Sequence, residues 1–351
     1  MGRGRAGEAA NHTGRSGRRA RWRDAGTIAP VLEVLTVTFP FFALVLAGYV
    51  AARRRLLPLE AIPGLNGFVL FFALPCMLYR FGATTPIAQL LDVAVFGVWL
   101  LCALVIVGFT VAISLNARIG WNDASFGALV AAFPNTGFMG VPLLVALLGA
   151  RAAGPIIVTI VVDMVITSSL CIALSRLDSA DEHGFAHAAR NALKGMLFNP
   201  MPWAIVLGTV ASAISLELPA PVFKTIGLLA DAASPVALFT IGAVLARSQI
   251  LTALHGHPPI PLGDFLPVAL IKLLLHPVLV LTVGATAVSL GVPLDRFALT
   301  VMVLIAALPS ASNVSLLAER FGADNGRIAR IILVSTAAAF LTFSGAVALL
   351  T

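Results

Sequence analysis

The chain has 351 residues, of which 59% are hydrophobic and 11% are charged, and its mean hydropathy is +0.98. A soluble globular domain carries roughly 25% charged residues, so a surface facing water along most of the chain is excluded. Several apolar stretches exceed the roughly 20 residues that a membrane-spanning helix requires. The composition therefore predicts an all-α polytopic membrane protein.

The net charge of +7 does not indicate nucleic acid binding. Seven arginines lie within residues 3–23, and most other basic residues flank apolar segments, where charges that set topology are expected. The cysteines Cys76, Cys102 and Cys171 lie within apolar runs without metal-ligand spacing and are interpreted as small core residues. We expect neither a metal, nor a cofactor, nor a nucleic acid partner.

Residues 1–29 are rich in Arg and Gly and almost devoid of apolar side chains, which predicts a disordered tail. A signal peptide is disfavoured, because the following apolar run is too long and ends in Arg53-Arg54-Arg55 rather than at a small-residue cleavage site. Two interpretations of this segment remain: it is a cytoplasmic tail, or it is not translated because translation starts near Val31. We favour the later start, because the tail charges oppose the loop charges.

Beyond residue 29, the apolar runs fall into two groups of five. A polar interval, 176–197, separates the two groups and is expected to be a cytoplasmic connecting loop. We therefore predict a first five-helix repeat over 30–175 and a second over 198–351. The expected spans are 30–52, 62–81, 93–116, 124–148, 153–175, 198–215, 222–246, 265–290, 297–318 and 328–350.

The two halves share a spacing of glycine and proline. Gly67 is followed eight residues later by Pro75, and Gly227 is followed eight residues later by Pro235. Five spans per half place the halves in the membrane in opposite directions, which is the inverted-repeat architecture of many secondary transporters. If the first span enters from outside, the inner loops hold eleven Lys and Arg and the outer loops four, which predicts both termini outside.

Pro134 and Pro309 each interrupt a long apolar run, in spans four and nine. A proline inside a helix removes a backbone donor, which hydrocarbon tolerates only where protein or a water-filled cavity satisfies the freed groups. The half-helix ends offer an amide pole that suits a carboxylate and a carbonyl pole that suits a cation. We expect these broken helices to cross and to bind substrate through Pro134, Asn135, Thr136, Gly137, Gly140, Pro309, Ser310, Ser312 and Asn313.

The alternative for each segment is a kinked packing helix with small residues at its interface. Ionisable groups within spans are functional candidates by default, and we select Asp231, Lys272 and His276 as candidates for ion coupling. Asp163 shares a helical face with hydroxyl side chains and is interpreted as joining helices.

The segment from Phe133 to Pro142 resembles the fourth-helix signature of the auxin efflux carrier family, and that from Leu308 to Gly322 resembles the ninth. The resemblance covers residues 31–351. It implies a ten-helix inverted-repeat carrier with a scaffold domain and a transport domain. Plant members export the carboxylate hormone auxin, and bacterial members are described as permeases for malonate or malate. The short 176–197 interval resembles the compact bacterial type.

We expect a secondary active transporter of small organic anions, such as mono- or dicarboxylates, in the plasma or inner membrane. We expect an ion gradient, with a proton or sodium as the possible coupling ion, or the membrane potential to drive transport. Direct coupling to ATP is disfavoured, because no nucleotide-binding loop occurs. An enzyme is disfavoured, because neither H-E-x-x-H nor G-x-S-x-G is found. A sodium-coupled carrier of the bile-acid symporter type, a membrane sensor that binds without transporting, and a homodimer all remain open.

Overall fold

The computed structural model describes residues 28–84, 92–177, 200–254 and 260–350. In these ranges the chain is helical, and its only extended pairing is an isolated bridge between Pro134 and Ser310. The expected tail and most of the expected connecting loop lie outside the described residues.

The first half contains α1 (Ile28–Arg53), α2 (Ile62–Phe68), η1 (Val69–Ala73), α3 (Leu74–Thr84), α5 (Val93–Ser114), α6 (Trp121–Ala132), η2 (Thr136–Gly140), α7 (Val141–Leu148), η3 (Ala150–Ala152), α8 (Ala153–Val161), η4 (Val162–Thr167) and α9 (Ser168–Leu174). The second half contains α11 (Pro200–Ala213), α12 (Ala220–Leu254), α13 (Leu262–Leu270), η6 (Ile271–Leu275), α14 (His276–Ser289), α15 (Arg296–Ala306), α16 (Val314–Arg320) and α17 (Asn325–Leu350).

Among the described residues, six continuous helical stretches are long and apolar enough to cross a membrane: Ile62–Thr84, Val93–Ser114, Ala150–Leu174, Ala220–Leu251, Leu262–Ser289 and Asn325–Leu350. Four shorter apolar helices are Phe39–Arg53, Thr136–Leu148, Trp203–Ala213 and Arg296–Ala306. Each of the ten apolar runs expected from the sequence overlaps one of these helices. The all-α, multi-pass class predicted from composition is therefore confirmed.

Three of the membrane helices contain a widened, π-helical turn that ends two residues before a proline. These turns are η1 before Pro75, η2 before Pro142 and η6 before Pro277. A proline cannot donate to the carbonyl four residues earlier and its ring clashes with that carbonyl. The neighbouring amide then bonds one residue further back, as His276 N does to the Ile271 carbonyl.

The fourth widened turn, η4, has a different cause, because no proline follows it. The Ser168 hydroxyl donates to the Asp163 carbonyl at 2.8 Å, and the Ser168 amide bonds to the same oxygen. A side chain that inserts into the helical ladder in this way bends or widens the helix.

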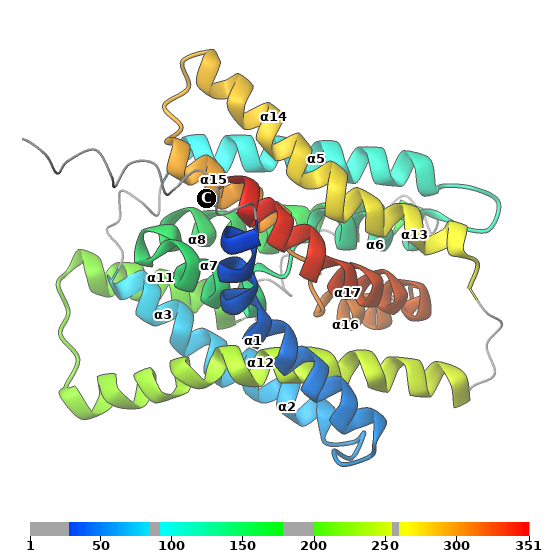
Figure 1. Cartoon of the computed structure of the whole chain (residues 1–351), viewed down its shortest axis with the longest axis horizontal. Helices are drawn as coiled ribbons and strands as arrows, with labels where there is room; N and C mark the ends of the chain where they lie inside the picture. The colour runs from blue at the N-terminus through cyan, green and yellow to red at the C-terminus, as the bar shows by residue number, and fades with distance from the viewer. Residues whose placement is uncertain (1–27, 85–91, 178–199, 255–259, 351) are drawn as a thin grey trace, which may run out of the picture.

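The helices form two groups (Figure 1). In the scaffold group, α1 packs along α12, α3 packs along α11, and α12 also contacts α2 and η1. In the crossover group, α5, α6, α13, α14, α15 and α17 pack around one another, together with the α7–α9 segment and α16. The half-helices α6 and α15 are central, since residues 124–132 and 301–306 are all buried.

Glycines allow the close approaches within the scaffold group. A Cβ at Gly48 would overlap the Phe239 carbonyl, and one at Gly242 would overlap the Val45 carbonyl, so α1 and α12 touch backbone to backbone. Gly82 and Gly208 play the same part between α3 and α11. In a membrane, small residues permit the close packing that takes the place of a hydrophobic driving force between helices.

Candidate functional site

The two broken helices meet at their breaks. α6 ends at Ala132 and α15 at Ala306, and the extended residues that follow run antiparallel to one another. Asn135 N donates to the Pro309 carbonyl at 2.8 Å, and Ala311 N donates to the Phe133 carbonyl at 3.0 Å. Backbone groups that the interrupted helices leave unpaired are thus satisfied by the partner break, as burial away from water requires.

Polar side chains at this crossing are buried but incompletely bonded. Asn135 is 2% exposed, and Thr136 and Ser310 are fully buried. Asn135 Oδ1, Ser310 Oγ and Asn313 Oδ1 have no hydrogen-bond partner. A buried polar atom without a partner costs about 1–3 kcal/mol, so these atoms mark a place where a ligand or water completes the bonding.

A small cavity of about 20 Å³ lies beside the crossing. Its polar wall comes from the two breaks, and its apolar wall comes from α3, α8 and η4. A cavity of this size holds about one water molecule, so the site is closed in this conformation. The lining residues are Leu74, Leu78, Phe133, Pro134, Asn135, Thr136, Gly137, Phe138, Ile160, Met164, Ala311 and Asn313.

The predicted substrate-binding residues divide into two sets around this cavity. Pro134, Asn135, Thr136, Gly137 and Asn313 line the cavity. The other four lie at the crossing but do not line the cavity. The Pro309 carbonyl accepts one of the bridge hydrogen bonds, and the Ser310 amide donates to the Ser335 hydroxyl. Ser312 is 9% exposed, and a Cβ at Gly140 would clash with the Leu308 side chain.

A second polar cluster lies within the crossover group. Asp163 is fully buried, and its Oδ1 accepts from Trp99 Nε1 at 3.0 Å and from the Thr167 hydroxyl at 3.3 Å. Its Oδ2 has no partner. The sequence interpretation of Asp163 as a residue that joins helices holds for Oδ1, which links η4 to α5, and leaves Oδ2 unexplained.

Lys272 and His276 form the other side of the same cluster. Both are fully buried, and Lys272 Nζ lies 3.0 Å from His276 Nδ1 and donates to the Ala306 carbonyl at 2.9 Å. The His276 ring lies 5.3 Å from the Trp99 ring, and Lys272 interacts electrostatically with Asp163. Sequence reasoning selected Lys272 and His276 but not Trp99 or Asp163. The four-residue spacing of Lys272 and His276, which places both on one helix face, is the signal that could have grouped them.

Asp231, the third ion-coupling candidate, lies apart from this cluster. Its carboxylate is 68% exposed and pairs with Arg80 at 2.7 Å, between α12 and α3. Asp231 is not among the residues that line the cavity at the crossing.

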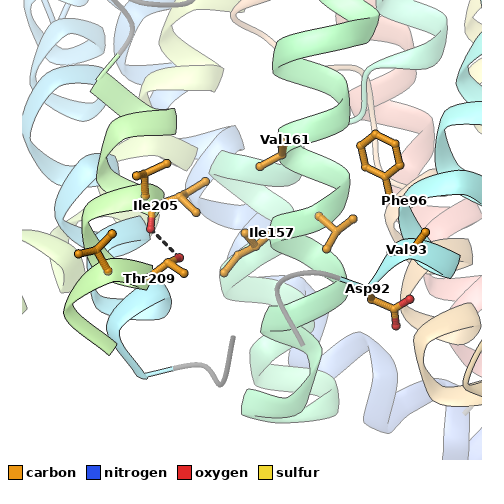
Figure 2. A pocket seen from close by; sticks show the side chains of 10 residues that line it. Asp92, Val93, Phe96, Ile157, Val161, Ile205 and Thr209 are labelled. Carbon is orange, nitrogen blue, oxygen red and sulfur yellow. Dashed lines mark hydrogen bonds between the residues drawn. The ribbon is translucent and has the colours of Figure 1, made fainter. Parts of the chain in front are cut away.

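A larger cavity, of about 610 Å³, lies between α5, α8 and α11 (Figure 2). Its walls are valine, isoleucine and phenylalanine, with Asp92 and Thr209 as its polar side chains. Asp92 already accepts from the Val95 amide, and Thr209 donates to the Ile205 carbonyl. This cavity therefore offers an anion no free donor, and the crossing is the better candidate site.

Comparisons with known proteins identify relatives that are membrane transporters. A family model described as "Membrane transport protein" matches residues 33–347. Over 314 residues the chain is 29% identical to the "Putative malonate transporter" of Rhizobium meliloti strain 1021, covering 89% of this chain and 94% of that relative.

Two further relatives widen the range of organisms. The "Uncharacterized transporter YfdV" of Escherichia coli K12 is 29% identical, with 80% of this chain and 86% of the relative covered. The "Auxin efflux carrier component 8" of Arabidopsis thaliana is 22% identical, with 64% of this chain and 74% of the relative covered.

Proposed function

Because this chain belongs to the membrane transport protein family, the family of the auxin efflux carriers, and is a membrane transporter, we propose that it is a secondary active carrier of small organic anions. The proposed substrates are mono- or dicarboxylates. The proposed site is the crossing of the two broken helices, and substrate reaches it from the two sides of the membrane in turn.

One observation carries the proposal: the amide side chains of Asn135 and Asn313, one from each break, line the same small cavity, and their Oδ1 atoms have no hydrogen-bond partner. Each amide also brings two N–H donors. Amide donors in a dry site suit a carboxylate. The name of the Rhizobium relative favours a dicarboxylate such as malonate.

The proposed architecture is a pair of inverted five-helix repeats. Its support comes from glycines that the packing uses: Gly48 and Gly208 lie 160 residues apart, and so do Gly82 and Gly242. The contact of α1 with α12 therefore has a counterpart in the contact of α11 with α3, as two repeats related by a two-fold rotation would produce.

The proposed movement is a displacement of the crossover group relative to the scaffold group. The cavity of about 20 Å³ is too small for a dicarboxylate, and its walls come from both groups: Leu74 and Leu78 from α3, and the breaks from the crossover group. Separating the two groups would enlarge the cavity while leaving the bridge between the breaks intact. Both termini outside and a location in the plasma or inner membrane stay predictions from the loop charges.

The test uses Asn135→Ala and Asn313→Ala in purified protein reconstituted into liposomes. Each change removes an amide from a site with little water, which costs roughly 1–3 kcal/mol when the bonded group loses its partner. We expect malonate transport to fall about tenfold or more, with unchanged thermal unfolding in detergent.

Asn66→Ala on α2 is the matched control, because Asn66 is half-buried in the scaffold group and lies outside the cavity lining. We expect the control to transport at the wild-type rate. If both crossing variants transport malonate at the wild-type rate, the substrate does not bind at the breaks. Malonate binding without any transport by the wild-type protein would favour a sensor instead.

A further inference from the structure

The buried cluster of Trp99, Asp163, Lys272 and His276 has no part in the substrate cavity described above. None of the four residues lines that cavity. All are fully buried, and Asp163 and Lys272 both lie in widened helical turns, η4 and η6. Widened turns of this kind occur frequently at functional sites, and ionisable groups within a membrane are retained at a cost.

The bonding of the cluster is uneven. Asp163 Oδ1 accepts two hydrogen bonds, whereas Oδ2 accepts none. Lys272 donates to His276 and to the Ala306 carbonyl but makes no direct ion pair with Asp163 among the described residues. A fully buried carboxylate oxygen without a donor is unfavourable, and a proton on Oδ2 would relieve that cost.

The cluster is connected to the crossing at two points. Ala306 is the last residue of α15, so the Lys272 ammonium binds the negative pole of the half-helix that leads into the second break. Met164, the neighbour of Asp163 in η4, lines the substrate cavity itself. A change of charge at Asp163 therefore acts next to the site that receives the anion.

We infer that Asp163 is the proton-binding group of the transport cycle and that its protonation makes the charge of Lys272 available to a bound carboxylate. The inference rests on the proposed function. In the empty carrier Asp163 and Lys272 compensate each other. A proton that enters forms an O–H bond at Oδ2, leaves Lys272 without its counter-charge, and thereby favours the anion. The proton and the anion cross together and are released together on the other side.

The surroundings of Asp163 favour a proton over a sodium ion. Hard cations prefer several oxygen ligands, whereas Asp163 offers one free carboxylate oxygen, and the nearby Lys272 ammonium would repel a cation. The titratable groups around Asp163 in the described part of the chain are Lys272 on η6, Cys171 on its own helix, and His276, whose ring lies 5.3 Å from that of Trp99. No group of three or more acidic, histidine or cysteine residues that could hold a metal occurs in the described part of the chain.

The experiment compares wild-type protein with Asp163→Asn, using malonate as the probe at pH values where both its carboxyls are ionised. Binding of one proton with the anion predicts that the wild-type Kd rises about tenfold per pH unit once the empty carrier is deprotonated. In Asp163→Asn we expect a Kd that does not change with pH, retained malonate exchange, and loss of accumulation driven by a pH gradient.

Asp295→Asn is the matched control, because Asp295 is 61% exposed and reaches Arg151 only at 3.9 Å. It should keep the wild-type pH dependence. If Asp163→Asn does not fold, the charge-neutral double variant Asp163→Asn/Lys272→Met replaces it, with weaker and pH-independent binding expected. A wild-type pH dependence in either Asp163 variant overturns the inference.

A second readout separates this inference from the proposed function. Infrared difference spectra, recorded across pH without substrate, should show a protonated buried carboxyl in the wild type and not in Asp163→Asn. That signal together with no malonate binding or transport would overturn malonate as substrate and leave the proton site standing. Malonate binding without that signal would overturn the proton site and leave the carrier standing.

Discussion

The scaffold group and the crossover group are built on opposite principles. In the scaffold group, backbones touch at Gly48, Gly82, Gly208 and Gly242, and Thr240 is its buried polar side chain among the residues described. In the crossover group, the buried side chains among the described residues include four ionisable ones: Asp163, Lys272, His276 and Arg327. The molecule thus separates a region held by shape from a region held by charge and hydrogen bonds.

That separation follows from what each region has to do in a membrane. Helices without buried charge can pack closely at no electrostatic cost, and they give a fixed surface. Buried charges are unfavourable unless paired and hydrogen-bonded, so their confinement to the crossover group indicates a purpose beyond packing. The comparison predicts that charge changes and shape changes affect the two groups in different ways.

The largest effect is expected for Lys272→Met. While Asp163 stays ionised, removing the ammonium leaves a buried carboxylate without compensation, which costs about 3–5 kcal/mol, so the loss is measured above the pH at which Asp163 takes up its proton. The double variant Lys272→Met/Asp163→Asn should recover most of that loss, because neither charge remains. The free energy of unfolding, measured in detergent by chemical denaturation, decides the matter.

Lys224→Met on α12 is the matched control for this cycle, since Lys224 is exposed. It should change the free energy of unfolding by less than about 0.5 kcal/mol. Equal losses in the single and the double Lys272 variants would show that packing, and not charge, holds the cluster.

The next effect is expected for Gly242→Ala on α12. The new Cβ overlaps the Val45 carbonyl of α1, so the two helices must separate, at a cost of about 1–3 kcal/mol for an overpacked contact. Gly227→Ala on the same helix meets nothing within 4 Å. It should be neutral or stabilising by up to about 1 kcal/mol, since alanine favours the helix. The midpoints of thermal unfolding of the two variants, measured under the same conditions, check this difference. Similar midpoints would show that the contact between α1 and α12 accommodates a methyl group.

The smallest effect is expected for Asp231→Asn. Its ion pair with Arg80 is largely exposed, and exposed pairs contribute about 1 kcal/mol or less. We expect nearly wild-type stability and an unchanged pH dependence of malonate binding. Loss of that pH dependence in Asp231→Asn would move the proton site out of the crossover group.

The sequence predicted the apolar runs and the two interrupted helices, because proline and hydropathy act locally. It also selected five residues that line the crossing cavity, since a break in hydrocarbon requires polar partners nearby. Asp163 shows where such reasoning ends. Its meaning depends on Trp99 and Lys272, which lie far from it in the chain and reach it only through tertiary packing.

Asp231 shows the opposite difficulty. The sequence placed it within a span, and it does lie in the apolar stretch Ala220–Leu251. Its side chain, however, is exposed and pairs with Arg80. Hydropathy locates a residue along the chain but not around the helix axis. Which face of α12 points toward α3 depends on how the helices of the group pack together, including the contact of Gly242 with α1.

The short bridge between Pro134 and Ser310 has a consequence for ligand affinity. Because the two breaks bond to each other through their own backbones, the crossing keeps its geometry when no substrate is bound. A site that is already ordered spares an arriving molecule the entropy cost of assembling it. A small carboxylate, which has few atoms with which to make contacts, can therefore be recognised by a handful of amides and hydroxyls.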